Sequence, residues 1–343
     1  MHTYLIEMLE CPACHGRLNW DITEQTEDRI ETAEAHCNVC AATYPVRDGI
    51  GLFLTPELQR NDLWEQVDSG LIQHLREHPE LERRLMDVPL DTLAPADQFF
   101  RALVLEEQGN FKEAQIIADS ADKGLYTPEH INCRNSQLDY VVEWLSTTEG
   151  PIVDLASGIG YLVEKVVREL KRPIVATDFS PSVLRRDRKR LESFGLYNYV
   201  SLLAFDARYT PFKDGTITTL TTYVGLPNIQ EPGNLLVELR RIVAGVFLAI
   251  SQFFPEEDEA NAKVIHEAKL DPLLYRGTAL QHFAEAGWNV EVKNTCVGEA
   301  QPTPPSVVLT GARIDGLPVA DTKLEWCVLL GTSQSSNSKQ GAG

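Results

Sequence analysis

The sequence lacks the features that would place it in a membrane or on a secretory route. None of its 343 residues falls in an uninterrupted apolar run of 18 or more, which a membrane-spanning helix requires. The N-terminal stretch MHTYLIEMLE has no basic segment followed by an apolar one and a small-residue cleavage site. We therefore expect no signal peptide and a cytoplasmic protein.

Positive charge and internal repeats are also scarce. The chain has 31 Lys and Arg residues against 50 Asp and Glu residues, a formal net charge of −19. Such a field repels polyanions, which disfavours nucleic acid as a partner without excluding it. The segment EEQGNFKEA is similar to part of a helical-hairpin repeat, but it occurs only once. Repeat arrays need about three units, so we do not expect a repeat protein.

The seven cysteines are few, and four of them have an informative spacing. Two Cys-x-x-Cys pairs are separated by 22 residues: Cys11 and Cys14, then Cys37 and Cys40. In a cytosolic chain this set predicts one tetrahedral, closed zinc site rather than disulfides. His15 and His36 flank the pairs, but four thiolates need no further ligand. The alternative, a redox pair, is disfavoured because the two pairs match and no βαβ pattern surrounds them.

The apolar pattern divides the chain into four parts. Residues 1–56 hold the cysteine pairs, and residues 57–148 repeat apolar side chains at the three- and four-residue spacing typical of helices. Over 149–332, β-branched runs alternate with amphipathic segments, which predicts an α/β domain with a mostly parallel sheet covered by helices on both faces. The tail 333–343, SQSSNSKQGAG, is too polar and small to pack, and we expect it to be disordered.

A glycine turn follows the first strand of the α/β part, in PIVDLASGIGYLVEKVVREL. Strand, small-residue turn and amphipathic helix are the first unit of a nucleotide-binding fold. A dinucleotide fingerprint needs glycines at i, i+2 and i+5; after Gly158 and Gly160 the third position is Val163. No Gly-Lys-Ser/Thr phrase follows either, which excludes a phosphate-binding P-loop. The turn therefore suits a ligand that approaches the backbone closely but brings no pyrophosphate.

Carboxylates end the first three strands of this part, at Asp154, Asp178 and Asp206. Asp154 supplies negative charge beside the turn, which a sulfonium nucleoside requires. Asp178 lies 18 residues after Gly160, where a carboxylate can accept hydrogen bonds from both ribose hydroxyls. Asp is also common at strand ends for turn reasons, so each carboxylate alone would carry little weight.

Read as Asp154-x-Ala156-x-Gly158-x-Gly160, the turn resembles motif I of the class I S-adenosylmethionine-dependent methyltransferases. The resemblance implies a Rossmann-like sheet with strand order 3-2-1-4-5-7-6, the seventh strand antiparallel, and S-adenosylmethionine as cofactor. Ala156 departs from the glycine of many relatives, but a methyl group is tolerable there. The cofactor-binding set that the resemblance implies is Asp154, Ala156, Ser157, Gly158, Gly160, Asp178, Phe179, Ser180, Asp206, Ala207 and Tyr223.

The cysteine-bearing part resembles the small zinc-ribbon family of methyltransferase activator subunits, whose members end in a phrase similar to Tyr-Pro-x-x-Asp-Gly-Ile. The likeness spans about residues 4–54 and implies a structural zinc ion and a ribbon able to hold a protein partner. Zinc ribbons also precede the methyltransferase domain of ribosomal-RNA guanine-N1 methyltransferases. An RNA methyltransferase and a non-enzymatic adaptor are therefore the two alternatives to a small-molecule enzyme.

The fourth strand of the α/β part ends in TYVGLPNI, where this fold lines the methyl-transfer site. The Asn/Asp-Pro-Pro-Tyr phrase of amino-group methyltransferases is missing, and so is the cysteine nucleophile of the pyrimidine C5 enzymes. The segment is more similar to small-molecule enzymes, including ubiquinone- and menaquinone-type C-methyltransferases. We expect Tyr223 to lie near the sulfonium or the acceptor and Asn228 farther away, or else both to be ordinary strand and turn residues. No pattern identifies a catalytic base or distinguishes carbon, oxygen, nitrogen and sulfur acceptors.

Three other sets of residues are expected to have structural roles only. We expect Cys133, Cys296 and Cys327 to be buried small hydrophobes. The basic run Arg185–Arg190, RRDRKR, is expected to be a solvated helix face away from the ligand edge of the sheet. His266 and His282 lie in helical stretches, where a solvated or packed histidine is the ordinary case.

Overall fold

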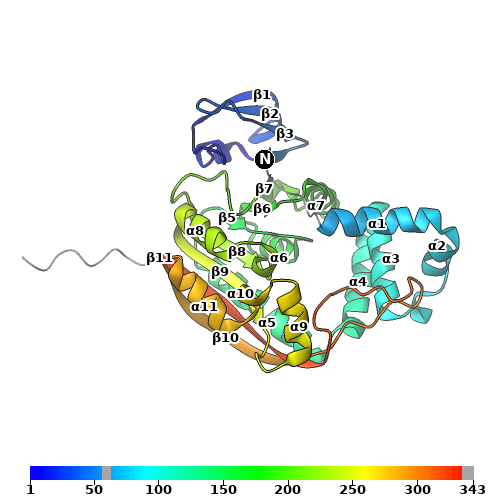
Figure 1. Cartoon of the computed structure of the whole chain (residues 1–343). Coiled ribbons are helices and arrows are strands. Elements are labelled where there is room, and N and C mark those ends of the chain that lie inside the picture. Colours follow the sequence, from blue (N-terminus) through cyan, green and yellow to red (C-terminus); the bar gives the residue numbers. More distant parts are fainter. Residues whose placement is uncertain (56–62, 334–343) are drawn as a thin grey trace, which may run out of the picture.

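The computed structural model describes residues 1–55 and 63–333 of the chain (Figure 1). Its helices are α1 (Leu63–Glu77), α2 (Pro79–Met86), α3 (Pro95–Glu107), α4 (Phe111–Leu125), α5 (Pro128–Ser146), α6 (Tyr161–Leu170), α7 (Pro181–Ser193), α8 (Pro232–Ile242), α9 (Glu259–Glu267), α10 (Asp271–Leu274) and α11 (Arg276–Glu285). None of these helices is long and apolar enough to cross a membrane. The expected disordered tail lies, but for Ser333, outside the described residues.

Seven strands form the sheet that the sequence predicts. In chain order they are β5 (Ile152–Asp154), β6 (Ile174–Asp178), β7 (Val200–Phe205), β8 (Ile217–Tyr223), β9 (Val243–Phe253), β10 (Trp288–Ala300) and β11 (Thr322–Ser333). Their order across the sheet is β7-β6-β5-β8-β9-β11-β10, and β11 runs antiparallel to β9. Numbered from one to seven, this is 3-2-1-4-5-7-6 with the seventh strand reversed, so the predicted fold class is confirmed.

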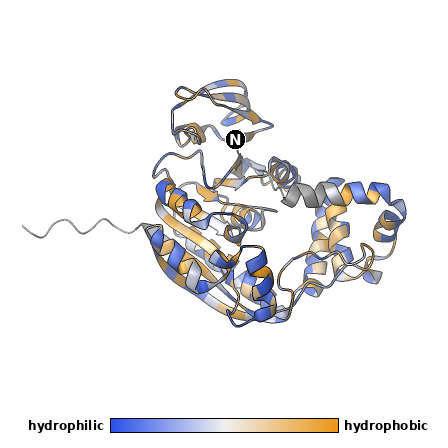
Figure 2. Ribbon diagram, viewed as in Figure 1, coloured by the Kyte–Doolittle hydropathy of each residue, from blue (hydrophilic) through white to orange (hydrophobic). Residues whose placement is uncertain are grey.

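Helices bury both faces of this sheet because its central strands are apolar on both sides. All residues of β6 and β7 are buried. Alternate strand residues enter two apolar clusters, one shared with α5, α6 and α7 and the other with α8 and α11. Figure 2 shows the central strands largely hydrophobic and the outward faces of the surrounding helices hydrophilic. Burial on both faces is what a parallel sheet with helical crossovers requires.

The N-terminal part continues the same sheet instead of standing apart. Its strands β1 (Leu18–Thr26), β2 (Arg29–Cys37), β3 (Thr43–Arg47) and β4 (Ile50–Phe53) form an antiparallel meander, and β4 pairs in parallel with β7. The buried N-terminal ammonium of Met1 donates to the carbonyls of Ile30 and Gly49 at 2.9 and 2.6 Å. The edge strand of the predicted seven-stranded sheet is therefore covered, which leaves no free strand edge at β7.

Helices α1 to α4 lie beside the sheet with a small apolar core of their own (Figure 1). Buried Asp97 of α3 ties this unit to the connection between β10 and β11. Its carboxylate accepts hydrogen bonds from the Ser306 hydroxyl and from the backbone N–H groups of Val307 and Val308, the latter two at 3.1 Å. The connection 301–321 is thereby held against the helical unit.

The expectation of a solvated helix face at Arg185–Arg190 is wrong. Arg186 and Asp187 are 9% and 4% exposed, and the Arg190 guanidinium forms ion pairs in which α7 contacts α3 and α6. Arg188 reaches the N-terminal meander, 3.3 Å from the Glu31 carboxylate. The helical unit and the N-terminal meander both pack on α7. The pattern of charges in the sequence cannot predict this tertiary packing.

The expectation for two of the lone cysteines is also wrong. Cys133 of α5 and Cys296 of β10 form a disulfide with their Cα atoms 5.6 Å apart, whereas Cys327 is buried and free as expected. The two half-cystines are 163 positions apart in sequence. Only the packing of α5 on β10 brings them together.

Candidate functional site

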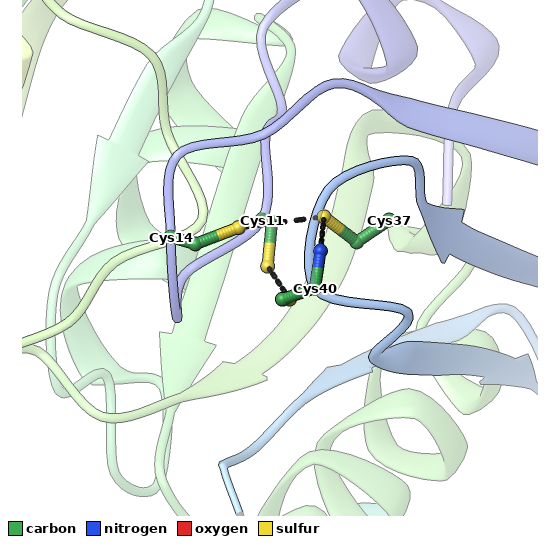
Figure 3. A group of neighbouring side chains, drawn as sticks. All are labelled: Cys11, Cys14, Cys37 and Cys40. Carbon is green, nitrogen blue, oxygen red and sulfur yellow. Dashed lines mark hydrogen bonds between the residues drawn. The ribbon is translucent and has the colours of Figure 1, made fainter.

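Four cysteine side chains converge from two loops of the N-terminal meander (Figure 3). The Sγ atoms of Cys11 and Cys40 lie 3.6 Å apart and those of Cys14 and Cys37 lie 3.5 Å apart. All four sulfurs are within 4.8 Å of one another. A tetrahedral zinc ion with Zn–S bonds of about 2.3 Å needs its sulfurs about 3.8 Å apart, so the donor set fits the ion.

The surroundings of the cysteines support a structural metal site. The backbone N–H groups of Val39 and Cys40 lie 3.4 and 3.5 Å from the Cys37 sulfur, which stabilises a thiolate. A side chain at Gly16 would meet the same sulfur at 2.8 Å. His15 instead contacts Glu10 at 2.7 Å and His36 contacts Thr43 at 3.1 Å, so neither histidine is oriented as a ligand.

The glycine turn lies between β5 and α6 and has an unusual backbone. Ala156, Gly158 and Gly160 all have positive φ, of 51°, 54° and 75°. Gly160 is the N-cap of α6, so the turn presents the amide groups of a helix N-terminus. The N–H of Gly158 donates to Asp178 at 3.1 Å, and the Ser157 hydroxyl accepts from the N–H of Thr177 at 3.1 Å. The turn is thus fixed to the end of β6.

Two of the predicted carboxylates flank this turn. Asp154 is 1% exposed and accepts a hydrogen bond from the Thr221 hydroxyl at 2.6 Å, and burial raises its pKa to about 6. Asp178 is 6% exposed, and its second oxygen accepts from the N–H of Ser180 at 3.0 Å. The Ser180 hydroxyl is used as the N-cap of α7. Asp154 and Asp178 therefore lie at neighbouring strand ends beside the glycine turn, where the sequence predicted them.

The third carboxylate has a partner that the sequence analysis did not anticipate. Asp206 follows β7, and its two oxygens accept from Nε and Nη2 of Arg208 at 3.0 and 2.7 Å. Arg208 also donates to Glu231 at 2.6 Å. Ala207, between them, is 9% exposed. In this structure the Asp206 carboxylate is thus charge-balanced by an arginine.

Tyr223 lies at the end of β8, and the chain beyond it touches the glycine turn. A Cβ at Gly225 would stand 2.8 Å from the Cβ of Ala156, so only glycine fits this approach. The half-buried ring of Tyr223 makes an edge-on contact with the ring of Tyr161, with centroids 6.2 Å apart. Asn228 is exposed at the end of the short 3₁₀ helix Leu226–Asn228, and Phe179 is half-buried just after β6. The structure thus brings Tyr223 to the turn and leaves Asn228 on the surface.

Several polar and aromatic side chains beside Tyr223 were missed in the sequence. Tyr126, at the end of α4, donates a hydrogen bond to Asp315 at 2.7 Å across 189 positions of sequence. Arg134 of α5 makes two hydrogen bonds to Asp122 of α4, at 2.9 and 2.6 Å. His130 of α5 stacks on Tyr126 with ring centroids 4.8 Å apart.

Part of this group could have been found from sequence. Thr127 and Pro128 are an N-cap and a first-turn proline, so they predict a helix start that puts His130 and Arg134 on one face, four residues apart. Asp315 lies in an irregular connection, and no sequence pattern indicates that it belongs to this group. His266 is 84% exposed on α9, in keeping with the expected solvated role.

Comparison with known proteins gives two family matches. Residues 2–49 match the model of the Trm112p-like protein, and residues 152–245 match that of a methyltransferase domain. A UPF0434 protein of Aliivibrio fischeri is 37% identical over 65 residues, 19% of this chain and 86% of that protein.

Relatives of the second part are enzymes by name. The ubiquinone/menaquinone biosynthesis C-methyltransferase UbiE of Shewanella baltica is 29% identical over 129 residues, 36% of this chain. A demethylmenaquinone methyltransferase of Thermobifida fusca is 34% identical over 103 residues, 30% of this chain. The chain spans about half the length of these two, 51% and 43%.

Among solved structures, the YcgJ protein of Bacillus subtilis aligns with 58% of this chain and 99% of its own length, at 14% identity and a TM-score of 0.46. The fold assignment itself rests on the strand order and on the family models. The chain therefore carries a class I S-adenosylmethionine-dependent methyltransferase domain preceded by a Trm112p-like zinc-ribbon domain.

Proposed function

We propose that the protein transfers the methyl group of S-adenosylmethionine to a small-molecule acceptor. The observation that carries this proposal is the glycine turn between β5 and α6, fixed to Asp178 and bordered by the paired rings of Tyr161 and Tyr223. Beside it, Tyr126 donates to Asp315, and the Arg134 guanidinium lies 5.6 Å from the centre of the Tyr126 ring. The charge of Arg134 also acts on Tyr161 and Tyr223. Aromatic and polar side chains from several elements can contact a small acceptor on more than one side, which is typical of small-molecule sites.

The cofactor would be held by residues at neighbouring strand ends. Asp178 would accept from the ribose hydroxyls, and the positive φ of Gly158 and Gly160 would let the ligand approach the backbone. Asp154 would place negative charge near the ammonium and sulfonium groups. We retain Asp206 and Ala207 in this set for the adenine end, on the condition that Arg208 shifts to release an acceptor oxygen.

Most of the catalysis would come from positioning. S-adenosylmethionine supplies a methyl group already activated as an electrophile, and the residues around it need only hold an acceptor atom in line with the carbon–sulfur bond. Proximity and orientation of this kind are worth roughly 7 kcal/mol or more.

The relatives support the small-molecule assignment by their names, which describe methylation in ubiquinone and menaquinone biosynthesis. Because this chain spans about half of each, the quinone-type acceptor is not carried over to it.

The structure weakens the RNA alternative. The basic run that would face a polyanion is used within the molecule, since Arg190 pairs with Glu106 and Glu164 and Arg188 pairs with Glu31. Binding to phosphates is driven by free cations and falls steeply with salt. Measurement of RNA binding at two salt concentrations would reveal that alternative.

The adaptor alternative is weakened by the ribbon's position. Its strand β4 is already paired with β7 of the methyltransferase sheet, and the N–H of His2 donates to Ser201 at 2.9 Å. A partner would have to use another face of the ribbon.

The test is calorimetry with S-adenosylhomocysteine and NAD side by side. The two ligands share adenosine, but only NAD has a pyrophosphate. The dinucleotide fingerprint that binds a pyrophosphate is incomplete in this chain, because its third glycine is missing. We expect S-adenosylhomocysteine to bind and Asp178→Ala to weaken it about 5- to 150-fold, from loss of roughly 1 to 3 kcal/mol of hydrogen bonding. Asp91→Ala, at an exposed carboxylate, is the control. Tighter binding of NAD, or unchanged affinity in Asp178→Ala, would refute the proposal.

A further inference from the structure

We propose that Tyr126, Tyr161, Tyr223 and Asp315 form the acceptor site and that it selects an acceptor carrying a basic amino group. This inference rests on the proposed methyl transfer and adds the chemical class of the substrate. These four residues are called the tyrosine–aspartate cluster below.

The cluster borders the glycine turn and is accessible. Tyr161 is the first residue of α6, directly after Gly160, and its side chain is 44% exposed. Tyr223 contacts Tyr161, and the chain after it abuts Ala156 of the turn. Tyr126, Tyr223 and Asp315 are half-buried. A ligand on these rings would lie next to the cofactor held by the turn.

The charges around the cluster do not cancel. The charge of Arg134 acts on Asp315, but both oxygens of Asp122 accept hydrogen bonds from the Arg134 guanidinium, so the charges of Arg134 and Asp122 balance. Asp315 accepts from the Tyr126 hydroxyl, and no Lys, Arg or His nitrogen of the described residues lies within ion-pair distance of it. His130 adds no charge near neutral pH, because burial and the charge of Arg134 lower its pKa to about 4.

This leaves one carboxylate in excess within a set of aromatic rings. An anionic acceptor would be placed against an unbalanced, partly buried charge, which is unfavourable. A cationic acceptor would gain from the carboxylate and from the faces of the tyrosine rings, because aromatic rings attract cations through their quadrupoles. An ammonium group can interact with both the carboxylate and the rings, and it also donates hydrogen bonds to the carboxylate.

The tyrosines are suited to donate hydrogen bonds rather than to accept a proton. Burial raises the pKa of Tyr126 and Tyr223, so their hydroxyls stay protonated. Asp315 is then the base of the cluster, because it is the carboxylate without a balancing cation.

The transfer can be written with all charges and atoms conserved. The Asp315 carboxylate takes one proton from the acceptor ammonium and leaves a neutral amine with a lone pair. The lone pair forms a bond to the methyl carbon as the carbon–sulfur bond breaks, and that electron pair stays on sulfur. The products are a methylated ammonium and S-adenosylhomocysteine, and Asp315 returns its proton to solvent.

The experiment compares two unreactive probes of one shape on protein saturated with S-adenosylhomocysteine. Benzyltrimethylammonium has a positively charged nitrogen at the position where neopentylbenzene has an uncharged carbon atom. We expect the cation to bind at least tenfold more tightly, by ligand-observed NMR. Asp315→Asn should remove most of this preference and leave the affinity for S-adenosylhomocysteine unchanged. Asp321→Asn, an exposed carboxylate farther along the same connection, should keep the preference.

A second variant guards against a folding defect in Asp315→Asn. Tyr161→Leu removes an exposed ring from the cluster and should also lower the preference for the cation, by several-fold. Equal binding of the two probes, or a preference that survives both substitutions, would overturn the inference. In either of those cases, bound S-adenosylhomocysteine would leave the methyltransferase proposal standing, whereas failure to bind it would refute the proposed function itself.

Discussion

Arg190 of α7 lies 2.6 Å from Glu106 of α3, and the same guanidinium is 3.0 Å from Glu164 of α6. One arginine therefore bridges the helical unit and the methyltransferase domain, with side chains that are only 11 to 15% exposed. Removal of this cation would leave Glu164 with Arg168 as its remaining partner at 2.7 Å, and Glu106 with Arg186 at 4.0 Å. The Glu106 carboxylate would therefore lose its close cation while still mostly buried, which is costly.

We expect Arg190→Ala to destabilise the protein by roughly 2 to 4 kcal/mol, the range for breaking a mostly buried ion pair. Urea unfolding would measure this, and Lys189→Ala, an exposed neighbour on the same helix, should change the free energy of unfolding by about 0.5 kcal/mol or less. If the two substitutions have the same effect, α7 does not hold the helical unit through this pair.

Local patterns predicted the methyltransferase part well. Tyr161–Leu170 is the very segment that amphipathic spacing marked as a helix, and the glycine turn and its flanking carboxylates Asp154 and Asp178 lie together as the motif implies. These features are encoded within about thirty residues of sequence, where periodicity and turn chemistry apply directly.

Long-range relationships escaped prediction because no local pattern encodes them. The contact of Tyr126 with Asp315 joins α4 to an irregular connection, and the disulfide joins Cys133 to Cys296. Arg190 looked like part of a solvated basic run, since a sequence does not show which unit will pack on a helix. Each of these pairings appears only after the helical unit is docked on the sheet.

We expect zinc to stabilise the methyltransferase sheet as well as the zinc ribbon. Because β4 pairs with β7, loss of the metal should loosen the edge of the methyltransferase sheet as well. We expect purified protein to hold about one zinc per chain, by the usual four-thiolate stoichiometry. Metal analysis should show its loss in Cys37→Ser, with a lower melting temperature for the whole protein.

His15→Ala is the matched control for zinc, since His15 adjoins Cys14 but contacts Glu10. This variant should keep its metal. Unchanged metal content in Cys37→Ser would disprove the four-cysteine assignment.

The buried carboxyl group of Asp187 should make the stability of the protein depend on pH. Both of its carboxylate oxygens are buried without a hydrogen-bond partner in the described part of the chain, beside a cavity of about 10 Å³ lined in part by Gly160 and Val163. Burial raises its pKa to about 8, against about 3.9 for an unfolded Asp. The folded chain therefore holds this proton more tightly, and its stability should fall as the pH rises from about 4 to 8.

Asp187→Asn keeps the shape of the side chain and removes the titration. We expect its free energy of unfolding to equal that of the wild type near pH 4 and to exceed it at pH 8 by about 1 to 3 kcal/mol. Urea denaturation at both pH values measures the difference, with Asp139→Asn as an exposed control. A variant that is no more stable than the wild type at pH 8 would show that Asp187 is ionised without penalty.

The disulfide between Cys133 and Cys296 joins helix α5 to strand β10. Cys133 lies next to Arg134, whose guanidinium pairs with Asp122 of α4, so the bond fixes the helix that holds this ion pair. Free-thiol titration of denatured, metal-free protein should find five thiols without reductant and seven after reduction. Since cytosolic thiols are kept reduced, the same count on freshly isolated protein also tests the expected cytoplasmic location.

We expect the double variant Cys133→Ser, Cys296→Ser to lose about 2 to 4 kcal/mol of stability, because the bond closes a long loop in the unfolded chain. Cys327→Ser is the contrasting variant: it replaces a buried thiol that is not bonded, so its effect should be the same with and without reductant. For the wild type, reductant should lower the free energy of unfolding to that of the double variant. Seven free thiols before reduction, or stability that is insensitive to reductant, would show that Cys133 and Cys296 pack as free thiols, as the sequence alone had indicated.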